Sequence, residues 1–314
     1  MGHIVALCGG VGGAKLADGL QQCLAPGQLR LIVNTGDDFE HRGMPICPDL
    51  DTVLYTLAGV ANAEQGWGRA NETWQVQTQW REMGIDTWFQ LGDRDIALHL
   101  YRRELQMQGM SLTQISRTLA RRFGVPSELL PMCEEPAPTT VLTEQGEMPF
   151  QEYFVKHQCR PVVRGFNYGG GALEPTADIC AALDDAGLAG IILCPSNPYL
   201  SIAPILAVAG LRDRLIHTKI PVIAVSPIIG GAAVKGPAAK IMRELELPVS
   251  PLEIAREYRD FLDVMLIDAA DAGLIASRRT DDPLLETAPI LMRAPGDRRI
   301  LAAVCVELLR RLRV

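Results

Sequence analysis

An apolar segment near the start of the chain runs directly into a loop of glycines. Ile-Val-Ala-Leu at 4–7 has the character of a buried strand, and Cys-Gly-Gly-Val-Gly-Gly-Ala-Lys follows at 8–15. Glycines let backbone amides approach an anion closely, and the positive end of the next helix points at the same place. The segment therefore predicts a seat for a nucleotide phosphate. A tight turn without a ligand is the alternative.

This loop matches neither of the two common nucleotide motifs. Leu16 stands where a Walker A loop has its magnesium-binding hydroxyl, and residues 10–15 depart from G-x-G-x-x-G at the last position. The glycines thus indicate a phosphate without identifying the molecule that carries it.

Four aspartates follow within fifteen residues. Asp37 and Asp38 end the second apolar segment, and Asp49 and Asp51 precede a helical pattern. Carboxylate oxygens suit a magnesium ion that bridges phosphates. Each group taken alone would fit an ordinary turn or helix cap, so the prediction depends on their combination.

A third acidic loop, Gly92-Asp93-Arg94-Asp95, precedes another helix. Arg94 would contact a phosphate, and the carboxylate of Asp95 would assist an incoming hydroxyl. His99 lies one turn beyond Asp95 on the same helix face. A capped helix with a surface ion pair is the equally weighted alternative.

Two later loops combine glycine, proline, serine and lysine densely after apolar segments. The first spans 194–202 and the second 226–240, where Gly230, Gly231 and Gly236 stand with two lysines ahead of a helix. The second loop predicts another anion cradle. No nucleophile elbow or H-E-x-x-H motif occurs in the chain, so the pattern indicates phosphoryl or phosphodiester chemistry, in which positioning and charge neutralisation dominate.

Short apolar runs alternate with helical stretches, a pattern typical of an α/β fold with a mostly parallel sheet. We expect strands at 3–8, 29–34, 189–194, 220–226 and 263–268. Helices are expected at 13–24, 50–62, 71–83, 94–108, 111–123, 174–186, 201–209, 236–245, 250–262 and 297–312. The proline-rich interval 124–173 predicts a smaller, β-containing insertion, so that 1–123 and 174–314 form the core.

Composition excludes several classes of partner. The 314 residues carry a formal net charge of −7, which disfavours nucleic acid and anionic membranes as partners. The eight cysteines form no C-x-x-C pair and are typical of a reduced, cytoplasmic protein. No apolar run reaches membrane-spanning length.

Taken together, the motifs resemble one known family, the 2-phospho-L-lactate transferases of coenzyme F420 biosynthesis. The similarity runs in order from residue 4 to about 270. The matching motifs are GGVGGAKL (9–16), NTGDD (34–38), CPDLDTVLYTL (47–57), GWG (66–68), NETW (71–74), LGDRD (91–95), PSNPYLSI (195–202) and SPIIGGAAVKGPAAK (226–240).

This resemblance implies a Rossmann-like, homodimeric, Mg²⁺-dependent transferase. The ribityl hydroxyl of Fo, the 7,8-didemethyl-8-hydroxy-5-deazariboflavin, would attack the phosphorus of a guanosine-diphospho donor. GMP would leave, and F420-0 or its dehydro form would result. The acyl unit of the donor would be 2-phospho-L-lactate, phosphoenolpyruvate or 3-phosphoglycerate. The CPDLDT, GWG and NETW forms are more similar to bacterial members, which makes lactate the less expected unit.

The resemblance also implies roles for individual residues. Asp37 and Asp51 would bind the metal or Fo, and Asp51 or Asp95 would accept the proton of the hydroxyl. The position before LGDRD is often basic in archaeal relatives and contacts Fo; here it is Gln90, a departure from the pattern. The other expected substrate-binding residues are Gly10, Gly12, Gly13, Lys15, Asn34, Asp49, Arg94, Ser196, Asn197, Gly230, Gly231, Lys235 and Lys240.

Two other functions compete with this reading. Related proteins share the glycine loop and the NTGDD turn, bind a UDP-sugar and act as regulators without catalysis. An NAD-dependent oxidoreductase would need an acidic residue about twenty positions beyond the glycines, and Asp37 lies close to that distance. No acid or base for hydride transfer is evident beside it.

Overall fold

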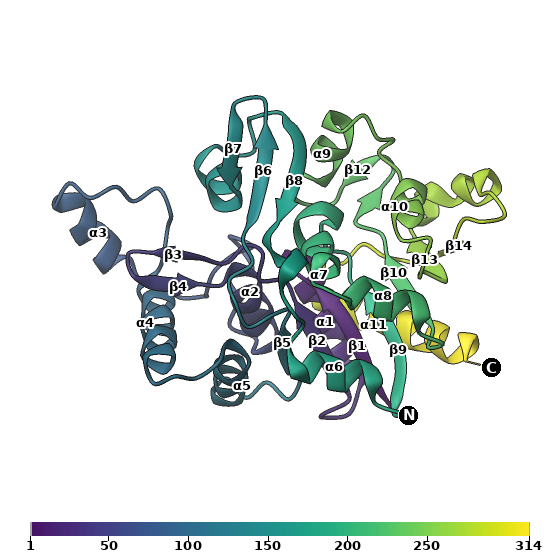
Figure 1. Ribbon diagram of the computed structural model, residues 1–314, viewed down its shortest axis with the longest axis horizontal. Coiled ribbons are helices and arrows are strands. Elements are labelled where there is room, and N and C mark those ends of the chain that lie inside the picture. The colour runs from purple at the N-terminus through teal and green to yellow at the C-terminus, as the bar shows by residue number, and fades with distance from the viewer. Residues whose placement is uncertain (1, 314) are drawn as a thin grey trace.

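Seven parallel strands form the centre of the molecule (Figure 1). The computed structural model describes residues 2–313. The sheet has the order β14-β13-β10-β9-β1-β2-β5, and every neighbouring pair is parallel. Its strands are β1 (His3–Cys8), β2 (Leu29–Val33), β5 (Glu128–Pro131), β9 (Leu188–Leu193), β10 (Val222–Val225), β13 (Val264–Ile267) and β14 (Leu284–Thr287). The five strands expected from the sequence are confirmed, and the predicted α/β class with them.

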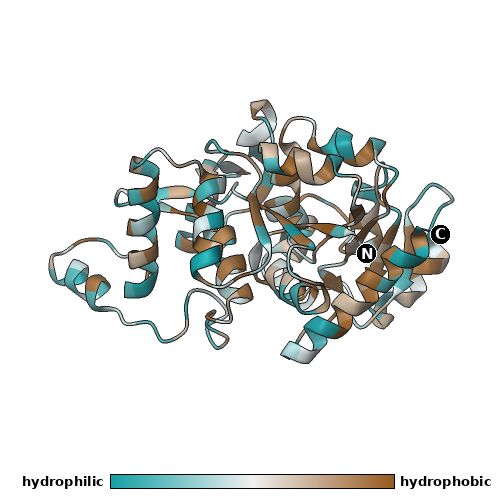
Figure 2. Cartoon of the chain, turned by 90° about the horizontal axis from the view of Figure 1, so that it is seen from below, coloured by the Kyte–Doolittle hydropathy of each residue, from teal (hydrophilic) through white to brown (hydrophobic). Residues whose placement is uncertain are grey.

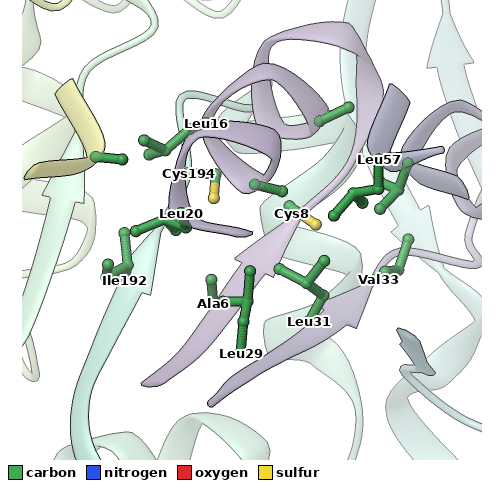
Figure 3. Close-up of a cluster of buried hydrophobic side chains, with 14 of the residues drawn as sticks. Ala6, Cys8, Leu16, Leu20, Leu29, Leu31, Val33, Leu57, Ile192 and Cys194 are labelled. Atoms are coloured by element: carbon green, nitrogen blue, oxygen red, sulfur yellow. The ribbon is translucent and has the colours of Figure 1, made fainter. Parts of the chain in front are cut away.

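Alternating side chains of the strands enter two separate cores. On β1, Ile4, Ala6 and Cys8 join one hydrophobic cluster, whereas Val5 and Leu7 join the other. Because both faces are covered, the strands read as continuous apolar runs in the sequence. Figure 3 shows the first cluster, and Figure 2 shows that hydrophobic residues gather in the middle of the molecule.

Helices cover both faces of the sheet. The first core includes residues of α1 (Gly10–Cys23), α2 (Pro48–Leu57), α4 (Asp93–Met107), α5 (Leu112–Arg122) and α11 (Pro295–Leu312). The second includes residues of α6 (Ala177–Asp184), α7 (Ala203–Ala207), α8 (Leu211–His217), α9 (Ala238–Glu244) and α10 (Pro251–Glu257). Helix α3 (Gln75–Glu82) stands away from the body beside α4 (Figure 1).

Three smaller sheets lie outside the central one. The predicted insertion contains β6 (Thr139–Thr143), which pairs antiparallel with β7 (Gly146–Pro149) and β8 (Val163–Tyr168). Two hairpins are formed by β3 (Phe39–His41) with β4 (Met44–Ile46), and by β11 (Ile228–Ile229) with β12 (Ala232–Ala233). The interval 124–173 also holds β5, which extends the central sheet beyond β2. The division into domains stays a prediction.

Several element boundaries differ from those expected. Helix α2 ends at Leu57 rather than at 62, because Gly59 takes the left-handed conformation with φ of 69°. The helix expected at 201–209 begins earlier, as a π-helical turn at Pro198–Ile202. The edge strands β5 and β14 and the helix α8 were not expected. The two edge strands are only partly buried, so they lack the continuous apolar run of β10 and β13, and α8 lacks a strong periodic pattern.

Strand order reverses on either side of β1, where the chain passes first to β2 and much later to β9. The loops that follow β1, β2, β9 and β10 leave the sheet at the same carboxyl edge. In open α/β sheets, ligands bind at this edge beside the reversal point. The fold thus gathers most of the predicted motifs in one place.

Candidate functional site

The glycine loop packs tightly against the segment that follows β9. Gly10 has a φ of 62°, a left-handed conformation that turns the chain from strand into helix. A Cβ on Gly12 would lie 2.4 Å from the carbonyl oxygen of Pro195, and one on Gly13 would lie 2.4 Å from Ser196 Oγ. Packing alone therefore requires these glycines. Gly9, the residue before helix α1, has no side chain to cap the helix, and the amide of Gly10 donates to a carboxylate of the protein, that of Asp49.

Ser196 and Asn197 hold the facing loop in shape. Ser196 Oγ accepts a hydrogen bond from the amide of Gly9 at 3.1 Å and donates to its carbonyl at 2.8 Å. Asn197 Oδ1 accepts from the amides of Tyr199 and Leu200 and so caps the π-helical turn. Both residues lie in the loop after β9, and their polar atoms fix its conformation against the glycine loop. Their contact with a substrate stays a prediction.

The side chain of Asn34 joins three loops at the carboxyl edge of the sheet. Its amide nitrogen donates to Asp37 Oδ1 at 3.1 Å, to Asp49 Oδ2 at 2.9 Å and to the carbonyl of Leu200 at 3.2 Å. Asp49 Oδ1 in turn accepts from the amide of Gly10 at 2.7 Å. One buried amide thus connects the acidic loop after β2 to the start of α2 and to the glycine loop.

Asp37 and Asp49 carry more negative charge than their surroundings compensate. Burial raises the pKa of Asp49 to about 6. Burial, and then the charge of Asp49, raise the pKa of Asp37 well above its ordinary value, while Asn34 lowers it. Burial likewise raises the pKa of Asp38. Two nearby buried carboxylates of raised pKa suit a divalent cation.

The donor set fits a magnesium ion that also binds substrate. Within residues 2–313, no group of three or more His, Cys, Asp or Glu side chains is arranged to hold a metal by itself. Mg²⁺ typically binds through one or two carboxylates together with substrate phosphates and water. The pair in this structure is Asp37 with Asp49, whereas the sequence pointed to Asp37 with Asp51.

Asp51 is paired with a buried arginine. Arg102 Nη2 donates to Asp51 Oδ1, and Nη1 donates to Oδ2 at 3.2 Å. Burial lowers the pKa of the guanidinium, yet the carboxylate of Asp51 raises it above its ordinary value. Sequence reasoning missed Arg102. A signal was present, because Asp95, His99 and Arg102 follow at helical spacing on the buried side of α4.

Asp95, the other predicted catalytic acid, is buried close to Asp51. Burial raises the pKa of Asp95 to about 7; the hydroxyl of Tyr55 lowers it, and the charges of Glu72 and Asp51 raise it. Within residues 2–313, Asp95 Oδ1 and the hydroxyl of Tyr55 form no hydrogen bond of ordinary length, although the two side chains are close enough for the hydroxyl to favour the carboxylate. Arg69 lies above the ring of Tyr55, and its buried Nε is also unpaired in residues 2–313. The two predicted acids thus share one polar neighbourhood.

The NETW and LGDRD motifs cap each other's helices. Glu72 accepts hydrogen bonds from the amides of Arg94 and Asp95 at the start of α4. Asp93 accepts from the amides of Gln75 and Val76 at the start of α3. The helix caps of the structural alternative are therefore present, and the roles of Arg94 and Asp95 toward a substrate stay predictions. The side chain of Arg94 is exposed and makes no hydrogen bond or ion pair in the part of the chain described, as a phosphate contact requires; Gln90 is also exposed.

The three predicted lysines do not lie together. Lys15 donates to the carbonyl of Met292 at 3.0 Å; burial, then Arg298 and Lys235, lower its pKa. Lys235 donates to the carbonyl of Gly66 at 3.0 Å, from the loop after β10. Lys240 instead forms an ion pair with Glu244. Lys15 and Lys235 lie close enough for their charges to interact, whereas Lys240 faces the insertion, where it donates to the carbonyl of Pro161 at 3.0 Å.

The second glycine cradle holds a carboxylate of the protein itself. The amide of Gly230 donates to Asp271 Oδ2 at 3.0 Å, and both Gly230 and Gly231 take left-handed conformations, with φ of 56° and 74°. The hairpin β11–β12 therefore has the geometry to present an amide to an anion. In this structure the anion is Asp271, from the 3₁₀ segment Ala269–Ser277.

No helix in residues 2–313 combines the length and apolar character needed to cross a bilayer.

Comparison with known proteins identifies the family. A sequence profile described as 2-phospho-L-lactate transferase CofD matches residues 4–286. A phosphoenolpyruvate transferase from Kitasatospora aureofaciens is 39% identical over 298 residues, covering 92% of each chain. A 2-phospho-L-lactate transferase from Methanosarcina acetivorans is 40% identical over 269 residues, covering 85% of this chain and 86% of the relative.

Solved structures agree on the fold. Two crystal structures of BH3568, a UPF0052 family protein from Bacillus halodurans, have TM-scores of 0.54 and 0.58 with 13% and 14% identity. They cover 91% and 98% of this chain, and 87% and 99% of the compared chains. At such low identity the similarity concerns the fold alone. The matches in sequence go further: the chain belongs to the 2-phospho-L-lactate transferase family.

Proposed function

We propose that the protein transfers a phospho-acyl group from a guanosine-diphospho donor to the ribityl hydroxyl of Fo. The hydroxyl oxygen forms a bond to the donor phosphorus, the phosphorus–oxygen bond to the guanosine phosphate breaks, and GMP leaves. The product is F420-0 or its dehydro form. The observation that carries the proposal is the hydrogen-bond network of Asn34. Its amide donates to the buried carboxylates of Asp37 and Asp49, and Asp49 in turn accepts from the glycine loop, all at the ligand-binding edge of the sheet.

Charge neutralisation is the main task of such a site. A bound Mg²⁺ would supply it by offsetting the charge of the donor's phosphates. Asp37 and Asp49 would hold the ion, since they are adjacent, buried and uncompensated. The exposed Arg94, together with Lys15 and Lys235, would attract the anionic donor.

Proton transfer from the attacking hydroxyl is assigned to Asp95. A carboxyl group with a pKa of about 7 exchanges protons readily at neutral pH. Its buried Oδ1 accepts no hydrogen bond of ordinary length among residues 2–313 and would accept the proton. Asp51, already paired with Arg102, would orient the acceptor rather than take its proton.

The assay combines purified protein, Fo, Mg²⁺ and an equal mixture of the three donors. We expect GMP release and a charged deazaflavin, whose mass identifies the acyl unit. The mixture is needed because relatives named for phosphoenolpyruvate and for 2-phospho-L-lactate have similar identity to this chain. No turnover with any donor would contradict the proposal. UDP-sugar binding without turnover would support the regulatory alternative instead.

Two further expectations accompany this function. The eight cysteines are all free, as suits an enzyme of the reducing cytoplasm. We expect a homodimer, which sedimentation velocity at micromolar concentration would distinguish from a monomer. A purely monomeric species over that range would contradict the dimer and leave the proposed chemistry intact.

A further inference from the structure

Arg102 is the most completely engaged buried cation beside the proposed site. Besides its two bonds to Asp51, its Nη1 donates to the carbonyl of Pro45 at 3.0 Å and to His99 Nδ1 at 3.1 Å. Its side chain is 2% exposed. A guanidinium buried this deeply cannot contact a substrate, so any role in the reaction passes through the groups it holds.

The imidazole of His99 reinforces this arrangement. Arg102 Nη1 lies 3.1 Å from His99 Nδ1. Because an arginine can only donate, a hydrogen bond between them requires a neutral imidazole with Nδ1 as the acceptor. Burial lowers the pKa of His99 to about 4, which agrees with the neutral form. The histidine thus fixes one face of the guanidinium and adds no charge to the pair.

The contacts of Arg102 tie three elements together. Asp51 lies in the first turn of α2, Arg102 lies in α4, and Pro45 lies in the hairpin strand β4. This bidentate contact between Arg102 and Asp51 fixes the rotation of the carboxylate as well as its position. A lysine at 102 would keep the charge but present a single point of attachment. Stability alone explains the pair poorly, since a buried ion pair is often replaceable by apolar residues without loss.

We propose that Arg102 is a positioning residue, whose guanidinium orients the carboxylate of Asp51 toward the acceptor hydroxyl. This inference rests on the proposed function, in which Asp51 addresses the acceptor. It adds a residue that lies outside every motif of the family resemblance. It also distinguishes the aspartates of the site by their counter-charges. Asp51 is neutralised by Arg102 of the protein, whereas Asp37 and Asp49 would be neutralised by a bound cation.

The test compares Arg102→Lys with Arg103→Lys in the assay described above. Arg103 is the matched control, because it lies on the same helix and also donates to the hairpin, at the carbonyl of Gly43, but does not touch Asp51. We expect Arg102→Lys to fold and to lose about tenfold or more in kcat, with the KM of the donor unchanged. Arg103→Lys should retain wild-type kinetics.

A second comparison distinguishes positioning from a structural role. In an Asp51→Asn background, Arg102→Lys should cause no further loss of kcat, because the carboxylate that it orients is already gone. An equal loss in both backgrounds, or wild-type kcat in Arg102→Lys, overturns the inference. If Asp51→Asn does not fold, crystal structures decide: a rotated Asp51 carboxylate on an unchanged α2 backbone in Arg102→Lys supports positioning, and an unmoved carboxylate overturns it. An inactive wild-type enzyme overturns both this inference and the proposed function.

Discussion

At the scale of single residues, the site contains carboxylates in three electrostatic situations. Asp51 has a buried arginine as its partner. Asp37 and Asp49 share the uncharged amide of Asn34, and Asp49 also accepts from the amide of Gly10. Asp95 has an oxygen without a hydrogen bond in residues 2–313. All four residues are aspartates, so these differences come from the neighbours that the fold supplies to each. The assignment of separate roles to the four aspartates rests on them.

The burial of Asp49 predicts that the stability of the folded protein depends on pH. The pKa of Asp49 rises from 3.8 to about 6 on burial, so the folded state holds this proton more tightly than the unfolded chain. Its contribution to stability therefore falls as the pH rises from about 4 to about 7. We expect Asp49→Asn to gain stability relative to the wild type across this window. Urea unfolding of both proteins at pH 4, 5, 6 and 7 measures the difference.

Glu64→Gln provides the control, since Glu64 is exposed and its neutralisation should leave the pH profile unchanged. The same Asp49 variant also tests the metal. Mg²⁺ at pH 7 should raise the Tm of the wild type and leave that of Asp49→Asn where it was. An equal rise in both proteins would remove Asp49 from the proposed metal site.

At the scale of elements, the motifs are largely contacts between loops. Glu72 and Asp93 explain why NETW and LGDRD occur together, because each carboxylate caps the helix that the other motif begins. The capping box that begins with Ser111 was predictable, since both partners are three residues apart. The reciprocal caps were not, because their partners are about twenty residues apart and no local rule relates them.

The first turn of α1 offers a matched test of close packing. Gly12→Ala would place a methyl group 2.4 Å from the carbonyl oxygen of Pro195. We expect it to cost about 1–3 kcal/mol of stability, as overpacking typically does. Gly296→Ala, in the first turn of α11, meets no atom within 4 Å and should stabilise by about 0.4–1 kcal/mol. Thermal unfolding of the two variants distinguishes them, and equal effects would argue against the packing of the glycine loop.

At the scale of the whole molecule, α11 completes the fold although it lies beyond the family match. The profile ends at residue 286, whereas α11 spans Pro295–Leu312 and buries Leu301, Ala302 and Cys305 in the first core. Its N-terminal turns pack against α1, the helix that begins with the glycine loop. The position of the helix that follows the glycine loop therefore depends on a segment that carries none of the motifs.

Adjacent residues of α11 allow a direct test. Leu301 is fully buried, and Ile300 is 54% exposed. We expect Leu301→Ala to cost about 2–5 kcal/mol of unfolding free energy. Ile300→Ala should stay within about 0.5 kcal/mol of the wild type. Urea unfolding gives both values, and a small effect of Leu301→Ala would show that α11 contributes little to the core.

The sequence by itself determined the parallel α/β class, the five long strands and the motifs near the site, because these depend on local composition and periodicity. Only the tertiary structure decided which charges meet. It joined Asp37 to Asp49 through Asn34, paired Asp51 with Arg102, placed Asp271 in the second glycine cradle and brought Lys240 to the carbonyl of Pro161 in the insertion. These partners are distant in sequence, and the energy of a buried charge depends on its neighbours in space.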